Sequence, residues 1–445
     1  PHPCFGGARP PLSRPPPRSP RDRRVYRLAV EMMTTLSARR VASLFFAFAF
    51  AYFLSALIRA VTATLSPTLS AEFALNAGDL GLLAGAYFLG FATTQLPLGT
   101  WLDRFGPKRV ILCFLVVAVL GCVAFSAATN FTELIVARAV WVVGVTACLM
   151  APLTGYRRWF APGMQLRANS WMLMSGSLGM VASTLPVQWL VPILGWRPLF
   201  WGLALLVLLA IGLISWAVPK WEQDHPGEVT APPAQGYGVV WAHPYFRKMA
   251  PLGFFCYGGL IAVQTLWAVP WMTKVAGYSS LEAAQALFWI NVAMLCTFWF
   301  WGAINPRLTR KGLHADSLIT RGLPFSFLLL AIVIIAGNSM PSLVGVGLGL
   351  YCMSCTFVAV SQPAVAMAFA PALAGRALTA YNLVMFSGVF AVQWGIGLAV
   401  DAFRSAGLTE IQAFQASMGL FLCCCVASYA YFLVPRRDNR NTVTP

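Results

Sequence analysis

Charged residues are scarce in this sequence: Asp, Glu, Lys and Arg make up 10% of the 445 residues, against about 25% in a typical soluble domain. Hydrophobic residues account for 58%, and the mean hydropathy is +0.70. So few charges cannot solvate the surface of a soluble globule of this length. The composition therefore excludes a soluble protein and predicts an integral membrane protein.

Acids are the scarcest charged type, with 14 Asp and Glu against 31 Lys and Arg. All of them lie in predicted loops or tails, or close to the end of a predicted helix. Asp79 and Glu282 are expected to cap helix N-termini, and Ser279 with Glu282 fits a capping box. Carboxylates deep in the membrane bind cations or relay protons in pumps. Their absence from the apolar stretches argues against a cationic-drug exporter and a sugar symporter with a buried acid.

No pattern indicates a metal, a cofactor or a catalytic centre. The four histidines lie outside the apolar stretches, at His2, His225, His243 and His314. Nearly all of the eleven cysteines lie inside them, where cysteine behaves as a small hydrophobic residue. The Cys-x-x-Cys at 352–355 lacks the second ligand pair of a zinc site. We expect no enzyme activity, metal or cofactor, and, without an ATP-binding loop, transport energy from a solute or proton gradient.

Twelve apolar stretches are long enough to cross the ~30 Å hydrocarbon core as helices. They lie near residues 41–64, 79–102, 110–128, 133–155, 168–191, 198–218, 249–271, 281–304, 322–337, 341–366, 377–401 and 413–434. A polar, proline-rich linker at 219–248 separates an N-terminal half, 41–218, from a C-terminal half, 249–434. The sequence predicts an all-α membrane protein with twelve transmembrane helices in two six-helix halves.

Basic residues are distributed unevenly between the two sides of these predicted helices. Twenty-six of the 31 Lys and Arg flank one side, and the opposite side holds only Arg197, Lys274 and Arg404. Since short cytoplasmic loops retain Lys and Arg, both termini are expected in the cytoplasm. This bias, together with a basic tail, accounts for the net charge of +17 without nucleic acid as a partner.

The two tails, 1–40 and 435–445, are expected to be cytoplasmic. The first is basic and proline-rich without apolar periodicity, so we expect it to be disordered. Translation starting at Met32 or Met33 is the alternative to a functional basic tail. The segment has no apolar core and is not a secretory signal.

One short loop carries an unusual density of charge. The stretch GTWLDRFGPKRV, residues 99–110, holds one acid and three bases between the second and third predicted helices. Gly99 permits close helix packing, and Gly106 permits a left-handed turn. An ordinary cytoplasmic loop would account for Lys108 and Arg109 but not for the acid or the glycines at these offsets.

This pattern resembles the signature loop of the major facilitator superfamily. The matching residues are Gly99, Asp103, Arg104, Gly106, Lys108 and Arg109. A degraded copy, GAINPRLTRKG, follows the eighth predicted helix; there Arg307 lies five residues beyond Gly302, and Pro306 replaces the acid. Further matching pieces are Arg138 with Gly144, residues 195–201 and residues 375–383. The resemblance covers residues 41–434.

The resemblance implies a bacterial-type permease of the inner (cytoplasmic) membrane. In that family two six-helix halves rock around a central site, so the chain would be a symporter or antiporter that works by alternating access. The signature loop resembles a cytoplasmic latch, in which Asp103 meets Arg376 or the N-terminal end of the eleventh helix. We expect a monomer in the lipid bilayer, and proton coupling stays open.

Two arginines lie deep in predicted helices, Arg59 in the first and Arg138 in the fourth. At similar depth in the outer half of the membrane, they either converge in one cavity or extend separately to the surface. Ser55 and Thr62 share a helix face with Arg59 and form a polar stripe. The resemblance also offers a role for Arg138 in proton coupling.

The seventh predicted helix, placed opposite the first by the repeat, carries Tyr257, Gln264 and Trp267, of which Gln264 and Trp267 are expected to share a face. Asn291, Asn382 and Gln393 are further intramembrane amides; interhelical hydrogen bonding is the alternative role for each. The predicted substrate-binding residues are Ser55, Arg59, Arg138, Tyr257, Gln264, Trp267, Asn291 and Asn382.

Two arginines facing an aromatic and amide wall suit a small organic anion, such as a carboxylate, because guanidinium binds carboxylate through paired hydrogen bonds. A nitrate or nitrite transporter is a second candidate, although the glycine-rich SGSLGMVAS in the fifth helix matches that family only loosely. A drug or metabolite efflux permease and a transporter-like sensor that binds its ligand without transport are further candidates.

Overall fold

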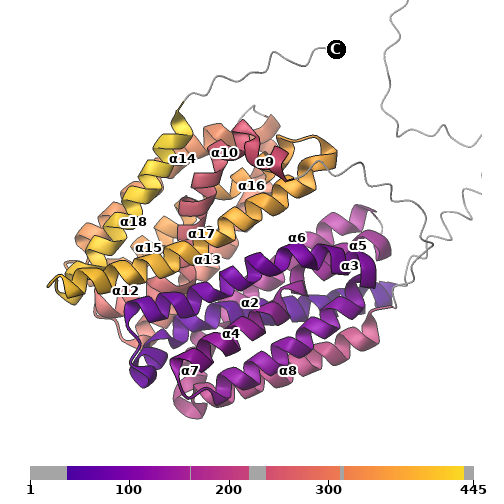
Figure 1. Cartoon of the computed structure of the whole chain (residues 1–445), viewed down its shortest axis with the longest axis horizontal. Coiled ribbons are helices and arrows are strands. Elements are labelled where there is room, and N and C mark those ends of the chain that lie inside the picture. Colours follow the sequence, from indigo (N-terminus) through magenta and orange to yellow (C-terminus); the bar gives the residue numbers. More distant parts are fainter. Residues whose placement is uncertain (1–37, 161, 220–236, 311–314, 435–445) are drawn as a thin grey trace, which may run out of the picture.

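The computed structural model describes residues 38–160, 162–219, 237–310 and 315–434, and in these ranges every regular element is a helix (Figure 1). The first group comprises α2 (Ala38–Phe73), α3 (Ala77–Ala127), α4 (Phe131–Val145), α5 (Ala147–Trp159), α6 (Pro162–Ala182), α7 (Leu185–Leu194) and α8 (Trp196–Ala217). The second group begins with α9 (Gly238–Ala242), α10 (Pro244–Leu252), η1 (Gly253–Tyr257), α11 (Gly258–Ala262), η2 (Val263–Trp267) and α12 (Ala268–Lys274). It continues with α13 (Ser280–Arg310), α14 (Ala315–Ala336), α15 (Pro341–Cys355), η3 (Thr356–Val360), α16 (Ser361–Met367), α17 (Pro371–Ser405) and α18 (Glu410–Leu433).

The described part of the chain has ten helical stretches long and apolar enough to cross a membrane. An eleventh is counted if Trp171–Ala182 and Leu185–Leu194, which meet at 43°, form one bent span. The remaining predicted span, near 79–102, is the first arm of α3, before the break at Gly106. The all-helical membrane architecture predicted from composition is confirmed.

Gly106 divides α3 into two arms. Its φ of 76° and ψ of 159° are non-helical, whereas the residues on both sides continue as helix. This positive φ is the left-handed region that glycine enters without steric cost, as predicted for the signature loop. The loop is therefore one sharp turn that joins the two arms of α3.

Several helices extend beyond the apolar stretches that predicted them. The ninth, expected at 322–337, is α14 and begins at Ala315. The turns of α14 before residue 322 carry Asp316 and Arg321. Because these residues are charged, a search for apolar stretches does not include those turns. Polar terminal turns suit a helix that emerges into the headgroup region. A prediction from apolar residues alone therefore underestimates the length of such a helix.

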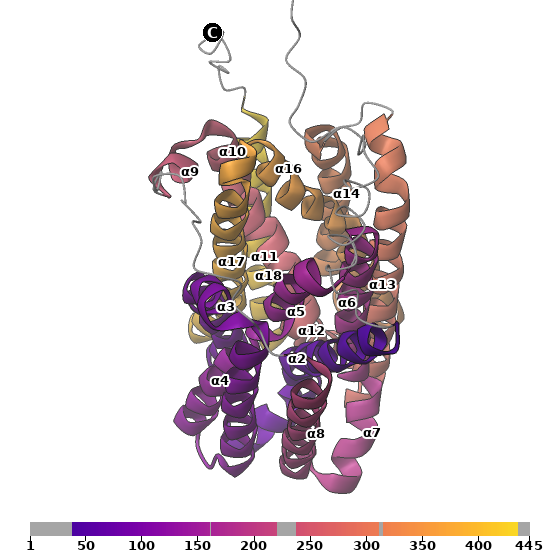
Figure 2. The same ribbon diagram turned by 90° about the vertical axis from the view of Figure 1, so that its right-hand side faces the viewer.

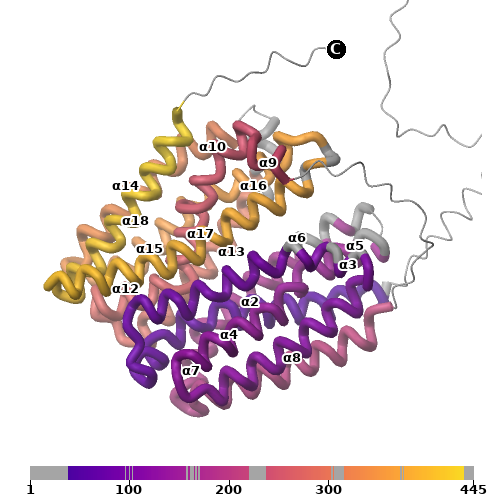
Figure 3. Tube along the Cα trace, in the orientation of Figure 1, coloured from indigo at the N-terminus to yellow at the C-terminus, as the bar shows by residue number. Residues whose placement is uncertain are grey.

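Buried residues form two clusters that follow the two groups of helices. One cluster runs from Leu44 to Val218 and adds Val389 of α17; the other runs mainly from Val240 to Phe432 and adds three residues of α2 and α3. In Figures 1 and 2 the two groups form adjoining bundles, and Figure 3 shows the same two bundles as a tube along the Cα trace. The bundles share their borders mainly along α2, α3 and α17.

Candidate functional site

Arg59 lies on α2 and is half-buried. Its Nη2 donates to the Sδ atom of Met180 on α6 at 3.6 Å, and its Nε is buried without a hydrogen-bond partner. Thioether sulfur is a weak acceptor, so this contact satisfies the guanidinium poorly. Arg59 therefore keeps hydrogen-bonding capacity and positive charge for another group.

Three tyrosine hydroxyls lie within electrostatic range of the Arg59 charge: those of Tyr52, Tyr87 and Tyr257. They come from α2, α3 and η1, and so from both bundles. Each ring combines an apolar body with a polar tip. The structure thus places predicted Tyr257 near Arg59 and adds two tyrosines that the sequence interpretation missed.

Two predicted amides connect to the same place. Gln264 Nε2 donates to Asn291 Oδ1 at 2.8 Å, and Asn291 Nδ2 donates to the carbonyl oxygen of Met180 at 3.4 Å. Met180 is thus contacted by Arg59 from the first bundle and by Asn291 from the second. We call Arg59, Met180, Asn291, Gln264 and the three tyrosines the Arg59 cluster.

Arg138 on α4 is 1% exposed and enclosed by its neighbours. Its guanidinium donates to Thr62 Oγ1 and, at 3.4 Å, to the carbonyl oxygen of Ala84. It also lies 5.8 Å and 5.2 Å from the ring centres of Tyr87 and Trp141. The side chain does not extend to the surface, and Tyr87 links its environment to that of Arg59.

Ser55 is buried and donates to the carbonyl oxygen of Val145 on α4 at 3.5 Å. Its hydroxyl also interacts with the side chain of Tyr87. The three residues of the polar stripe predicted along α2 therefore contact two different helices: Ser55 and Thr62 bind residues of α4, and Arg59 binds a residue of α6.

Trp267 contacts a different helix from Gln264, although helical spacing led us to expect the two on one face. Its indole N–H donates to the carbonyl oxygen of Gln393 on α17 at 3.1 Å, and its ring contacts Phe414 of α18. The reason is that Val263–Trp267 is π-helical, so residues three apart no longer align. Trp267 belongs to the packing of the second bundle.

Asn382 hydrogen-bonds to a residue outside the Arg59 cluster. Its Oδ1 accepts a hydrogen bond from Gln362 Nε2 of α16 at 2.5 Å. It precedes Gln393, which accepts the hydrogen bond from Trp267, by three helical turns, or about 16 Å at 1.5 Å per residue. The structure therefore gives Asn382 an interhelical hydrogen bond near the N-terminal end of α17.

The signature loop shows its contacts in part. Lys108 Nζ donates to the carbonyl oxygens of Ser215, at 2.7 Å, and of Val218 at the C-terminal end of α8. A cation at a helix C-terminus is stabilising because unpaired carbonyls carry partial negative charge. The side chains of Asp103 and Arg307 lie outside the described residues, so the latch to half-buried Arg376 stays a prediction.

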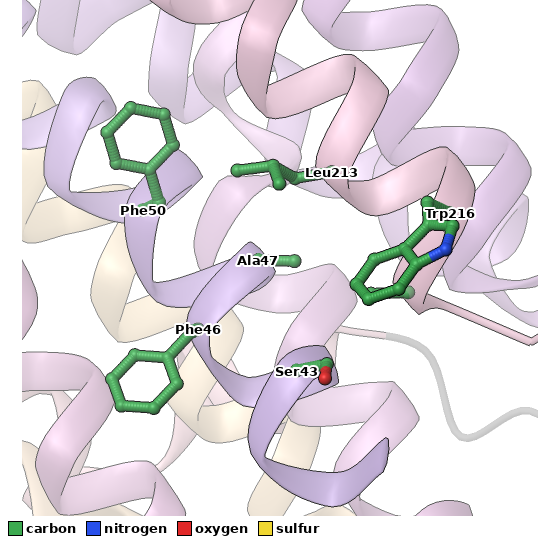
Figure 4. Close-up of a pocket in the computed structure, with 7 residues that line it drawn as sticks. Ser43, Phe46, Ala47, Phe50, Leu213 and Trp216 are labelled. Carbon is green, nitrogen blue, oxygen red and sulfur yellow. The ribbon is translucent and has the colours of Figure 1, made fainter. Parts of the chain in front are cut away.

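A groove of about 380 Å³ lies between α2 and α8, away from the Arg59 cluster (Figure 4). It is lined by Ser43, Phe46, Ala47, Phe50, Leu213, Trp216 and Ala217. Phe46 and Trp216 are largely exposed, at 66% and 78%. Such an apolar surface is suited to contact with lipid rather than to recognition of a polar solute.

Of the residues near Arg59 that sequence interpretation missed, one could have been found from the helical spacing and the others could not. Tyr52 lies seven residues before Arg59, which is two helical turns along the same face and therefore detectable. Met180 and Tyr87 lie on other helices, where nothing in the local pattern points to Arg59.

Among curated proteins the chain is similar to a probable sulfoacetate transporter of Cupriavidus necator, with 25% identity over 52% of this chain and 57% of that protein. It is 24% identical to a probable L-galactonate transporter of Escherichia coli, over 86% of this chain and 79% of that one. A third relative is a 4-hydroxybenzoate transporter of Acinetobacter baylyi, 26% identical over 33% of each chain. The matched part of the first relative is thus little more than half of its length.

The fold is similar to that of solved transporters. A bacterial homologue of the human lysosomal transporter Spinster, in an inward-facing and occupied conformation, matches with a TM-score of 0.74 at 16% identity over 90% of this chain and 97% of that one. A D-xylose–proton symporter matches with a TM-score of 0.73 at 14% identity, over 88% and 97%.

The family comparison covers most of the chain. The model of the Major Facilitator Superfamily matches residues 48–393, which contain the signature loop, both arginines and the amides of the Arg59 cluster. This family and this fold are those of membrane transporters rather than enzymes, as expected from the sequence. The chain belongs to the Major Facilitator Superfamily.

Proposed function

We propose that the chain transports a small organic anion, such as a carboxylate, by alternating access, and that Arg59 binds the anionic group. The observation that carries this proposal is the Arg59 guanidinium, whose Nε is buried without a partner and whose Nη2 has only a sulfur acceptor. An anion at this position would give the half-buried guanidinium charge-assisted hydrogen bonds in place of a weak sulfur contact, and so would stabilise it.

The neighbours of Arg59 suit an organic body. Tyr52 and Tyr257 offer ring surface and hydroxyl groups, and Gln264 and Asn291 offer amide groups from the second bundle. Arg59 stands on the first bundle, so a solute held by both sets would bridge the two. Such bridging suits a carrier whose site is exposed alternately to the two sides.

The names of three relatives agree with this substrate class. Sulfoacetate, L-galactonate and 4-hydroxybenzoate are organic acids that carry a carboxylate. The identities of 24–26% do not extend to a particular solute, and the proposal is therefore limited to the class.

Arg138 has a positioning role in this proposal. Its guanidinium donates to Thr62 on α2 and lies 5.8 Å from the ring centre of Tyr87, which interacts electrostatically with Arg59. The two arginines thus form neighbouring positive centres in the first bundle. Together they favour an anion beside Arg59 over a cation.

We also propose an inner-membrane location with both termini in the cytoplasm and a division into halves at 41–218 and 249–434. The distribution of basic residues and the two clusters of buried residues support this arrangement. The proposed substrate class does not depend on the direction of transport.

The test is uptake of labelled solutes into liposomes that contain the purified protein, with mono- and dicarboxylates, nitrate and neutral solutes in the panel. We expect saturable carboxylate uptake in the wild type. Arg59→Gln should reduce it by about tenfold or more, because a hydrogen bond to a charged group is lost at the site.

Arg197→Gln is the matched control, since Arg197 forms an exposed ion pair with Glu72 at a helix end. We expect it to change uptake by less than about twofold. Uptake confined to neutral or cationic solutes, or unaffected by Arg59→Gln, would refute the proposal. Nitrate uptake without carboxylate uptake would replace the organic anion by an inorganic one.

A further inference from the structure

Asp401 joins the two bundles at one end of the molecule. It stands one turn before the end of α17, and its two carboxylate oxygens accept hydrogen bonds from the backbone N–H groups of Ala77, at 3.2 Å, and Gly78, at 2.6 Å. Both donors belong to the first turn of α3. The first N–H groups of a helix lack acceptors within the helix and carry partial positive charge, so a carboxylate is a strong partner for them.

The local cap of α3 leaves these two donors unused. Asn76 and Asp79 form a capping box, in which Asp79 N–H donates to Asn76 Oδ1 at 2.7 Å and Asn76 N–H donates to Asp79 Oδ2 at 3.2 Å. Ala77 and Gly78 lie between these two residues. Their N–H groups donate to Asp401, which belongs to the other bundle. Asn76 and Asp79 therefore cap α3 within its own bundle, whereas Asp401 connects α3 to the second bundle.

Glycines bring α3 and α17 close enough for the short Asp401 side chain to reach. A Cβ atom on Gly81 would lie 2.5 Å from the carbonyl oxygen of Gln393, and one on Gly397 would lie 2.3 Å from the carbonyl oxygen of Ala77. The two backbones therefore meet without intervening side chains along this line. We call it the α3–α17 seam.

We propose that Asp401 is a latch that keeps the seam, and with it this end of the transporter, closed. Under the predicted topology this is the external end. Because the two bonds cross between bundles, they must break when the bundles separate there during alternating access. The proposal goes beyond the proposed function and does not depend on the identity of the substrate.

The contact has a counterpart in the predicted cytoplasmic latch. That latch would join Asp103 of α3 to the N-terminal end of α17, whereas Asp401 of α17 meets the N-terminal end of α3. Each pairs an acid of one helix with the N-terminal end of the other, at opposite ends of the same helix pair. Only the Asp401 contact has both partners among the described atoms.

Hydrogen–deuterium exchange of the purified full-length protein, without substrate, tests the latch. In Asp401→Asn we expect exchange to rise roughly tenfold in both 77–85 and 393–401, since the loss of a charge-assisted contact favours the open seam. Asp401→Glu keeps the charge and should remain nearer the wild type.

Asp79→Asn is the matched control, because it weakens the cap of the same helix within one bundle. It should raise exchange near residues 76–80 and leave 393–401 unchanged. Gly81→Leu separates the helices by steric conflict while retaining Asp401, and it should reproduce the exchange pattern of Asp401→Asn.

The latch is refuted if Asp401→Asn exchanges like the wild type in both segments, or if Asp79→Asn opens 393–401 to the same extent. If Asp401→Asn does not fold, Asp401→Ser, which also removes the charge, takes its place in the same measurement and is judged by the same outcomes. Since no substrate is present, failure of the latch is distinguishable from failure of the anion proposal.

Discussion

Arg59 and Arg138 both interact with Tyr87, yet their surroundings differ. Arg138 is fully buried against Thr62, a backbone carbonyl and two aromatic rings. The Nε atom of each arginine is buried without a partner, but the terminal nitrogens of Arg138 have oxygen acceptors, whereas Nη2 of Arg59 has only the sulfur of Met180. A residue type at a given depth therefore does not define its role, and the donors left over after packing are what a substrate can use.

Two asparagines allow a test at the residue scale. Asn291→Ala removes the partner of Gln264 beside Arg59, and we expect it to raise the KM for the transported anion several-fold. Asn382→Ala removes a comparable interhelical hydrogen bond, with Gln362, outside the Arg59 cluster, and the KM should not change. Measured uptake kinetics in liposomes would check both. Equal effects of the two variants would remove the amide pair from the site.

At the scale of the element, two features shape the helices around the site. The seventh span contains two π-helical segments, Gly253–Tyr257 and Val263–Trp267, which rotate the residues after them relative to a regular helix. Close helix crossings at glycines fix the remaining geometry. At the crossing of α3 and α4, a Cβ atom on Gly144 would lie 2.1 Å from the backbone nitrogen of Ala118.

Gly144→Ala should therefore destabilise the protein. Because the conflicting atom belongs to a backbone, the helices must move apart, at a cost of about 1–3 kcal/mol. Gly202→Ala on α8 is the matched control, since open space surrounds that position. Thermal unfolding in detergent should show a lower midpoint for Gly144→Ala only. An unchanged midpoint for both variants would contradict the close crossing.

At the scale of the whole molecule, each bundle has its own cluster of buried residues, and few residues of one bundle join the cluster of the other. The bundles also contact each other at the α3–α17 seam and through the Arg59 cluster, but each core consists mostly of residues from one bundle. Two units of this kind can move relative to each other while each keeps its packing, as rocking requires.

This independence predicts that the chain tolerates a cut between residues 219 and 237. Two co-expressed fragments divided there should assemble and co-purify, since each contains nearly all of one cluster. A cut between α3 and α4, at residues 128–130, divides the first cluster and should abolish recovery of assembled protein. Co-purification by an affinity tag on one fragment measures both. Equal recovery from the two cuts would argue against independent halves.

The sequence by itself determined the features that depend on composition and on neighbours along the chain. Scarce charge required a membrane protein, and the signature loop predicted both the family and the positive φ of Gly106. The Ser279–Glu282 capping box is present as expected. Insertion of a helix into lipid and capping of a helix end both depend on residues that are close together in the sequence. Both can therefore be deduced from the sequence alone.

Only the tertiary structure decided which polar groups meet. It brought Gln264 and Asn291 to Met180 beside Arg59, left Asn382 with Gln362, and turned Trp267 toward α17 through a π-helical segment. It also placed Asp401 on the first turn of α3, more than 300 residues earlier in the chain. Such pairings depend on the rotation and packing of helices that are distant in sequence, and the local pattern of each helix does not contain that information.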